Sequence, residues 1–217
     1  MQENSSDYVL DGLEDCLIGE KRGILSDLQL FVDLLKKWQT IQNLVSRETL
    51  ADLWMRHIRD SLQLLRYFPV QQGVVVDLGS GGGFPAIPLA IALRKSDWKF
   101  HLIEANRRKC SFLRTVSREL ALNVTVHDSR IEKLDRQLIG NADIITSRAT
   151  APLVRLLGLC APFWSEKTSA LLHKGREYGE ELKEAGAVWQ FDVLCLASET
   201  DPAGVIVKID QLSAKLS

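Results

Sequence analysis

The sequence lacks several features that would place it in a specialised class of protein. It has no apolar stretch near the ~18–20 residues that a membrane-spanning helix requires. Its first residues are acidic and lack the apolar segment of a secretory signal, so we expect a cytoplasmic protein with no membrane partner. Four cysteines stand far apart without a CxxC pair, and four histidines are scattered, so we expect packed, reduced thiols and no metal site. The cysteines are Cys16, Cys110, Cys160 and Cys195.

An excess of charge of one sign is also absent, because 27 Lys and Arg residues nearly balance 28 Asp and Glu residues. The distribution is uneven, since residues 1–20 carry only acidic charges and leave about +5 on residues 21–217. This mildly basic remainder permits a polyanionic partner without requiring one. The length of 217 residues and the hydrophobic share of 46% indicate one folded domain with a small appendage.

The first third of the chain is predicted to be helical. Residues 1–20 are expected to form a loosely ordered acidic lead-in that ends in a short helix. Apolar residues at helical spacing predict helices over residues 26–45 and 49–67. We therefore assign residues 1–70 to this lead-in and a helical extension. The expected cap and stop residues are Ser26 with Gln29 for the first helix, and Thr49 and Pro69 for the second.

The pattern changes after residue 70 to short β-branched runs that alternate with helical segments. Such alternation predicts an α/β fold whose sheet is mostly parallel, and the last two strands are predicted to form a terminal antiparallel hairpin. We assign residues 71–217 to this core domain. Strands are predicted over 73–79, 98–105, 123–129, 142–149, 168–175, 188–198 and 204–210, and helices over 86–95, 106–121 and 152–163.

The most informative segment is VVVDLGSGGGFPAIPLA, at residues 74–90. A predicted strand carries Asp77 near its end, and Gly79, Gly81 and Gly83 follow in a turn that leads into a helix. Glycine allows the backbone to adopt positive φ and to approach a ligand closely, and the helix N-terminus offers free N–H groups. In a doubly wound sheet this turn lies at the ligand crevice.

Two classes of cofactor compete for such a turn. A dinucleotide site needs a third glycine where this chain has Phe84, whereas GxGxG preceded by Asp77 resembles the first motif of methyltransferases that use S-adenosylmethionine. Glu104 ends the next strand, where a carboxylate can accept hydrogen bonds from ribose hydroxyls in either class. A nicotinamide-dependent oxidoreductase and a purely structural turn remain the alternatives.

Further crevice residues follow the third and fourth strands. Within residues 127–134, either Asp128 or the pair Ile131 and Glu132 could meet an adenine, and the sequence favours neither. Arg148 is placed at the rim, where it could hold a carboxylate, a phosphate or a base edge.

The acceptor of a methyl group is constrained by missing motifs. No (D/N)PP(Y/F/W) tetrapeptide follows the fourth strand, and no Pro-Cys or Thr-Cys dipeptide supplies a nucleophilic thiol. Cys160 lies in an apolar segment and is expected to pack in the core. The sequence offers no obvious catalytic base, which is consistent with an acceptor such as guanine N7 that carries no proton to remove.

Basic side chains on two helices suit a nucleic-acid partner. Arg107, Arg114 and Arg118 form one helical stripe, and each could equally be a solvated surface charge. The preceding helix adds Arg56, Arg59 and Arg66. That helix also places three polar residues on one face as a possible buried hydrogen-bonded set, namely His57, Asp60 and Ser61.

Taken together, these segments resemble the ribosomal RNA small-subunit methyltransferases once called glucose-inhibited division protein B. Each string is short, but their order and spacing along most of the chain are specific. The matching strings are KKWQTIQNLVS (36–46), MRHIRDSL (55–62), VVVDLGSGGGFPAIPLAI (74–91), HLIEANRRKCSFLRTV (101–116), HDSRIE (127–132), ITSRA (145–149) and HKG (173–175).

The resemblance implies a Rossmann-like class I methyltransferase that transfers a methyl group from S-adenosylmethionine to guanine N7 in a decoding-region loop of 16S rRNA. It implies the small subunit or its assembly intermediate as partner, and we expect a monomer. Cofactor contacts would fall on Gly79, Phe84, Ile131, Glu132 and Arg148, with Arg148 also the best candidate for positioning the reactants. Candidates for RNA contact are Arg56, Arg107, Arg114, Arg118 and Lys174.

This chain departs from the family pattern in the glycine turn. Gly82 stands where relatives often have proline, and Ala86 replaces a glycine, so we expect a looser loop. A small-molecule methyltransferase and a non-catalytic module that binds cofactor or RNA are the alternative functions.

Overall fold

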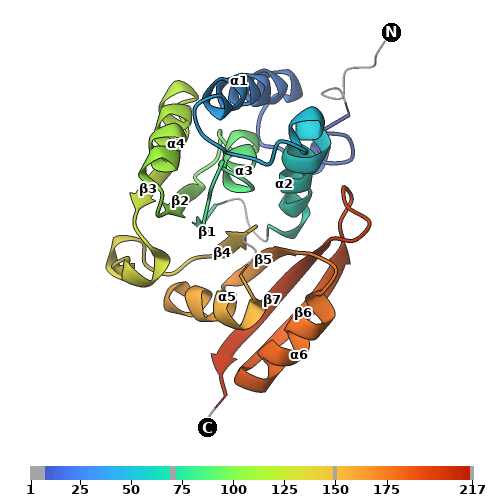
Figure 1. Ribbon diagram of the computed structural model, residues 1–217, viewed down its shortest axis with the longest axis vertical. Coiled ribbons are helices and arrows are strands. Elements are labelled where there is room, and N and C mark those ends of the chain that lie inside the picture. The colour runs from blue at the N-terminus through green and yellow to red at the C-terminus, as the bar shows by residue number, and fades with distance from the viewer. Residues whose placement is uncertain (1–7, 69–71, 149–150, 216–217) are drawn as a thin grey trace.

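A seven-stranded sheet forms the centre of the computed structural model, which describes residues 8–68, 72–148 and 151–215 (Figure 1). The strand order is β3-β2-β1-β4-β5-β7-β6. Strands β1 to β5 pair in parallel, and β7 pairs antiparallel with both β5 and β6. The predicted parallel sheet with a terminal hairpin is therefore confirmed. The strands are β1 (Val74–Leu78), β2 (Lys99–Glu104), β3 (Val124–Asp128), β4 (Ile144–Ser147), β5 (Ser169–Lys174), β6 (Trp189–Ala197) and β7 (Val205–Ala214).

Helices cover both faces of this sheet (Figure 1). Alternate residues of β1 point to opposite faces, so Val75 belongs to the apolar cluster under α1, α3 and α4, whereas Val76 belongs to the cluster under α5 and α6. The first cluster also includes Phe31 of α1, so the N-terminal helices share one continuous core with the sheet. The helices are α1 (Lys21–Gln39), α3 (Ala86–Ala92), α4 (Arg107–Glu119), α5 (Leu153–Cys160) and α6 (Tyr178–Val188).

Helix α1 differs from its predicted bounds at both ends. It begins at Lys21, so Ser26 lies inside the helix and the predicted capping box is wrong. It ends at Gln39, because the side-chain amide of Gln39 bonds the main chain of the next segment. Its oxygen accepts from the N–H groups of Leu44 and Val45, and its nitrogen donates to the Val45 carbonyl. These bonds turn the chain after Gln39, whereas the apolar spacing of the sequence predicts that the helix continues to residue 45.

The predicted second helix is an irregular series of turns. It runs through η2 (Leu50–Asp52), the π-helical η3 (Trp54–Arg59), α2 (Asp60–Leu62) and η4 (Gln63–Tyr67). Thr49 does not cap this series, because its hydroxyl bonds His57 and Ser46 instead. π-Helical turns are frequent at functional sites, and η3 carries Arg56 and His57. Pro69 lies outside the described residues.

The described part of the lead-in, from residue 8 onward, packs against the protein and is not loose. Val9 and Leu10 are fully buried, and the Arg59 guanidinium donates to the carbonyls of Val9 and Asp11. The expected short helix is present as η1 (Glu14–Cys16). The acidic lead-in is thus tied to η3 by the half-buried guanidinium of Arg59.

The remaining departures concern the C-terminal third and the thiols. Helix α6 was not predicted, because only Ala185 of its eleven residues is buried and its apolar pattern is weak. Cys160 is buried as expected, and burial raises its pKa to about 12, but Cys195 is exposed on β6. No helix of the described residues is long and apolar enough to span a membrane. In the same residues, no group of three His, Cys, Asp or Glu side chains is placed to hold a metal ion.

Candidate active site

The glycine turn after β1 has the geometry that its sequence predicts. Gly79, Gly81 and Gly83 have φ values of 75°, 56° and 91°, a region that side chains other than glycine rarely adopt. The N–H groups of Gly79 and Ser80 both donate to the Ile103 carbonyl of β2, at 3.0 and 3.1 Å. These bonds anchor the turn between the two strands and leave it at the carboxyl end of the sheet.

Gly82 is required by packing. A Cβ atom at Gly82 would lie 2.8 Å from the carbonyl oxygen of Leu44, which belongs to the segment that follows α1. The turn is therefore in contact with the N-terminal helical extension. A side chain at this position would require the Leu44 carbonyl to move.

A cleft of about 540 Å³ opens beside this turn, at the carboxyl ends of β1 and β2. It brings together four predicted cofactor residues, Gly79, Glu104, Ile131 and Glu132, whereas Asp128 does not line it. The cleft lies where the strand order reverses between β1 and β4, the usual ligand position in such sheets.

The Glu104 carboxylate fixes the mouth of the cleft. One oxygen accepts from the N–H of Gly81 at 2.9 Å, and the other accepts from the N–H of Asn106 at 2.8 Å. Each oxygen keeps a lone pair for a further donor. Glu132, on η5 (Ile131–Lys133), is exposed and pairs with Arg155 at 2.9 Å across the cleft.

Asp77 lies beneath the turn and does not line the cleft. Its Oδ1 accepts from the Thr146 hydroxyl at 2.7 Å, but Oδ2 has no hydrogen-bond partner within the described residues. Burial raises the pKa of Asp77 to about 7, because the charged form is poorly solvated there. Asp77 is therefore a buried acceptor with unused capacity directly below the glycines.

Phe84 and Arg148 lie together outside the cleft lining. The Phe84 ring is buried against Phe31 and His57, with centroid separations of 5.3 and 4.8 Å. The guanidinium carbon of Arg148 lies 5.2 Å from the Phe84 ring centroid. The structure thus gives Phe84 a packing contact with Arg148 and leaves both away from Ile131 and Glu132.

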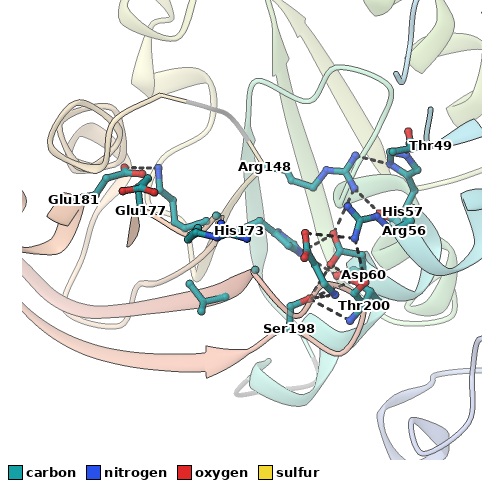
Figure 2. A pocket seen from close by; sticks show the side chains of 16 residues that line it. Thr49, Arg56, His57, Asp60, Arg148, His173, Glu177, Glu181, Ser198 and Thr200 are labelled. Atoms are coloured by element: carbon teal, nitrogen blue, oxygen red, sulfur yellow. Dashed lines mark hydrogen bonds and ion pairs between the residues drawn. The ribbon is translucent and has the colours of Figure 1, made fainter. Parts of the chain in front are cut away.

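A neutral histidine orients Arg148. The guanidinium donates to His57 Nδ1 at 2.5 Å, and His57 Nε2 lies 2.8 Å from the Thr49 hydroxyl (Figure 2). That hydroxyl donates onward to the Ser46 carbonyl. Burial and, secondly, the Arg148 charge lower the pKa of His57 to about 3. His57 is therefore neutral, with its proton on Nε2, and can accept from Arg148.

Asp60 is the centre of a buried polar network. Its Oδ1 accepts from the Gln63 amide at 2.8 Å and the Thr200 hydroxyl at 2.7 Å. Its Oδ2 lies 3.4 Å from both Arg148 and His173. The carboxylate therefore joins α2, the residue after β4, β5 and the turn between β6 and β7. The predicted set of His57, Asp60 and Ser61 is buried, but Ser61 bonds only the His57 carbonyl, at 2.6 Å, within that set.

These polar side chains form one wall of a second cavity of about 450 Å³ (Figure 2). Lys174 also lines it, with a side chain only 4% exposed, and its ammonium pairs with Glu181 at 2.5 Å. The same ammonium donates to the carbonyl of Ala151, which lines the cleft. The cavity and the cleft therefore share a wall. Lys174 is buried and paired, which does not suit the surface RNA contact that the sequence suggested.

The other basic candidates divide between two regions. Arg56 lines the cavity and pairs with Asp201 at 3.4 Å. Arg107, Arg114 and Arg118 are exposed on α4, which runs from the carboxyl edge of the sheet toward its opposite edge, so Arg118 lies ~16 Å along the axis from Arg107. The predicted stripe exists, but most of it lies away from the cavity. Arg59 and Arg66 pair with Glu199 and hold the turn between β6 and β7.

Comparison with known proteins gives both sequence and structural relatives. The family model for GidB, rRNA small subunit methyltransferase G, matches residues 24–200. The ribosomal RNA small subunit methyltransferase G of Cereibacter sphaeroides is 41% identical over 206 residues, which cover 92% of this chain and 98% of that protein. That of Bartonella tribocorum is 44% identical over 203 residues, which cover 92% and 93%.

Solved structures with low sequence identity share the fold. Fibrillarin from Aeropyrum pernix, with natively bound S-adenosyl-L-methionine, has a TM-score of 0.51 at 17% identity, over 63% of this chain and 66% of that one. A ribosomal protein L11 methylase from Lactobacillus delbrueckii has a TM-score of 0.56 at 14% identity, over 74% and 79%. The fold is the Rossmann-like α/β fold of the class I methyltransferases.

Proposed function

We propose that this chain, which belongs to the rRNA small subunit methyltransferase G family, transfers a methyl group from S-adenosylmethionine to N7 of a guanine in small-subunit rRNA. One structural observation supports the proposal most directly. The carboxyl edge of the sheet holds two hollows with a common wall, a cleft beside the glycine turn and a cavity lined by Arg148. A methyl donor and a methyl acceptor need such adjacent sites.

The residues of the cleft fit S-adenosylmethionine. The glycine turn admits the amino-acid end of the cofactor closely, since Gly79 lines the cleft without a side chain. Glu104 can accept from the ribose hydroxyls through its remaining lone pairs. Ile131 can cover the adenine face, and Glu132 can accept from the adenine amine. The unpartnered Oδ2 of Asp77, below the turn, suits the ammonium group.

The chemistry needs alignment more than proton transfer. Bound S-adenosylmethionine supplies a methyl group on a sulfonium. The lone pair of guanine N7 forms the new bond to that carbon while the sulfur–carbon bond breaks and sulfur retains its electron pair. No proton moves, and the positive charge passes from sulfur to the guanine. The chain therefore needs to hold N7 in line with the methyl group and to exclude water.

Arg148 is the positioning residue in this proposal. His57 and Asp60 fix its guanidinium at the cavity wall, and the ring of Phe84 lies beneath it. A fixed guanidinium can donate to the O6 acceptor of a guanine, next to N7. This arrangement orients the base without removing a proton from it.

The identity of the acceptor particle is also part of the proposal. We infer that the enzyme acts in the cytoplasm, as a monomer, on 16S rRNA within the small subunit or an assembly intermediate. Residues 1–70 serve as a helical extension that buttresses the core of residues 71–217, and exposed arginines such as Arg107 contact RNA phosphates.

The test is methyl transfer from labelled S-adenosylmethionine to naked small-subunit rRNA and to small subunits, both taken from cells that lack this gene. Chain cleavage at N7-methylated guanine maps the product. A single cleavage in the decoding-region loop is expected, and the ratio of the two acceptors shows which form is recognised. Cofactor binding by calorimetry without any transfer would contradict the proposal and favour a non-catalytic module.

A further inference from the structure

We propose that the cavity beyond Arg148 is the binding site of the target guanine, and that Glu177 selects guanine by accepting from its N1–H and N2 amino groups. This inference rests on the proposed function. It assigns to the cavity a ligand of defined chemistry, a guanine base turned out of its RNA stack, and it assigns to Glu177 the reading of that base.

The position of the cavity is the first argument. Its volume of about 450 Å³ lies within the range of roughly 300–1,000 Å³ typical of small-molecule sites. It is separated from the cleft by the contact between Lys174 and Ala151, so a base in the cavity lies next to a cofactor in the cleft. Figure 2 shows Arg148 and His57 at one end of the cavity and Glu177 and Glu181 at the other.

The two edges of guanine match these two ends. N7 and O6 are acceptors on one edge, and N1–H and the N2 amino group are donors on the opposite part of the base. With O6 toward the donor Arg148, the N1 and N2 donors of guanine need an acceptor elsewhere on the cavity lining, and a carboxylate can accept from two adjacent donors at once.

Most acceptors of the cavity are already used by the protein, and Glu177 is not. The Asp60 carboxylate is occupied by the network described above. Glu181 holds Lys174 and the N–H of Leu153. Glu177 precedes α6 without capping it through its side chain, and no bond of its carboxylate is seen within the described residues. It lies one helical turn from Glu181 and lines the cavity.

A buried histidine in the cavity lining has an unused hydrogen-bond acceptor. His173 lines the cavity with a side chain 9% exposed, and its Nε2 lies 2.9 Å from the Asp60 carbonyl. Because a carbonyl only accepts, Nε2 carries the proton and Nδ1 is an acceptor. Nδ1 is buried and has no partner within the described residues. Buried polar atoms are rarely left unpaired, so a ligand donor or a bound water is expected there.

Charge supports the same assignment. The methylated guanine is a cation, and a Glu177 carboxylate bound to it stabilises the positive charge that develops on the base, whereas Glu181 is already paired with Lys174 and Arg176 adds a positive charge to the same lining. The donors Arg148 and Lys174 are each balanced by a carboxylate of the network, Asp60 and Glu181.

The experiment replaces Glu177 in the protein and removes the N2 amino group from the target base, separately and together. Small subunits are reconstituted with rRNA ligated from segments that carry either guanine or inosine at the target position, since inosine lacks only the N2 amino group. Methyl incorporation is measured for the full-length wild-type chain, for Glu177→Gln, and for the control Glu180→Gln, an exposed residue outside the cavity. Cofactor affinity is measured in parallel by calorimetry.

Loss of a hydrogen bond to a charged group corresponds to about 10- to 100-fold in kcat/KM. The wild-type and Glu180→Gln chains should therefore prefer guanine to inosine by that factor. Glu177→Gln should lose a similar factor on guanine, keep its cofactor affinity, and show little preference between the two bases.

Two outcomes would overturn the inference in distinguishable ways. A wild-type chain that methylates no guanine would refute the proposed function and this inference with it. A wild-type chain that methylates guanine, with the inosine penalty unchanged in Glu177→Gln, would refute the assignment of Glu177 and leave the proposed function intact.

Discussion

Replacing Asp60 by Asn isolates the buried network that holds Arg148. The amide oxygen can keep the bonds from Gln63 and Thr200, which both reach Oδ1. The amide nitrogen then takes the place of Oδ2, where it points a donor at Arg148 and at Nε2 of His173, each 3.4 Å away. The substitution thus keeps the shape of the side chain, removes its charge and places an N–H donor against the donors of Arg148 and His173.

Breaking a buried ion pair by removing one partner costs ~3–5 kcal/mol. Arg148 is 25% exposed and keeps its bond to His57, so we expect a loss below that range, ~2–3 kcal/mol in the free energy of unfolding. For a domain of this size the loss corresponds to a decrease of ~4–12 °C in Tm. Methyl transfer should fall as well, because the guanidinium loses its carboxylate partner and keeps only His57 and the Arg56 carbonyl.

The assay is urea unfolding followed by tryptophan fluorescence, together with kcat and the cofactor Kd. The control is Asp52→Asn, the same change at an exposed position, which should alter stability by less than ~0.5 kcal/mol. If Asp60→Asn matched this control in stability, the carboxylate would not hold the network together. An unchanged kcat would show that Arg148 does not depend on it.

Four further substitutions test the rest of the site. Arg148→Ala should abolish methyl transfer while calorimetry shows cofactor binding retained, and a fully active variant would remove Arg148 from the site. Glu104→Gln should weaken cofactor binding by ~10-fold in calorimetry, because an amide replaces one ribose acceptor; unchanged affinity would contradict that role. Gly82→Ala should lower the free energy of unfolding by ~1–3 kcal/mol in urea melts, because the new Cβ meets the Leu44 carbonyl, and an unaffected variant would mean that the two segments separate easily. The pKa of Asp77 is about 7 in the folded state and 3.8 in the unfolded state, so between these values the folded state holds a proton that the unfolded state has lost. The free energy of unfolding should therefore decline as pH rises from about 4 to 7 and then level off. Asp77→Asn should remove that part of the pH profile, and an identical profile would contradict the raised pKa.

The sheet and the glycine turn could be predicted because their signals are local. A β-branched run such as residues 74–78, bounded by glycines, favours a buried strand, and a turn with several residues at positive φ favours glycine. The order of parallel strands then places Glu104 and Ile131 at the same edge as the turn.

The parts that were not predicted depend on distant contacts or on weak patterns. The burial of Asp60 could be predicted from its helical face, but its partners could not, because Arg148 and Thr200 are 88 and 140 residues away. The irregular turns around Asp60 were predicted as one regular helix, because their apolar residues recur at helical spacing. Helix α6 escapes prediction because one buried alanine carries little periodicity. The shared wall of the two hollows exists only once these elements have assembled.

The contact between residues 198–201 and η3 and α2 has a consequence for synthesis of the chain. Thr200 bonds Asp60, and Glu199 pairs with Arg59 and Arg66, so a segment made late completes a structure begun early. While the chain is still growing, residues 54–67 must wait for these partners, and closing so long a loop is slow. The network around Asp60, which contacts Arg148, is therefore complete only when a segment made near the end of synthesis is in place.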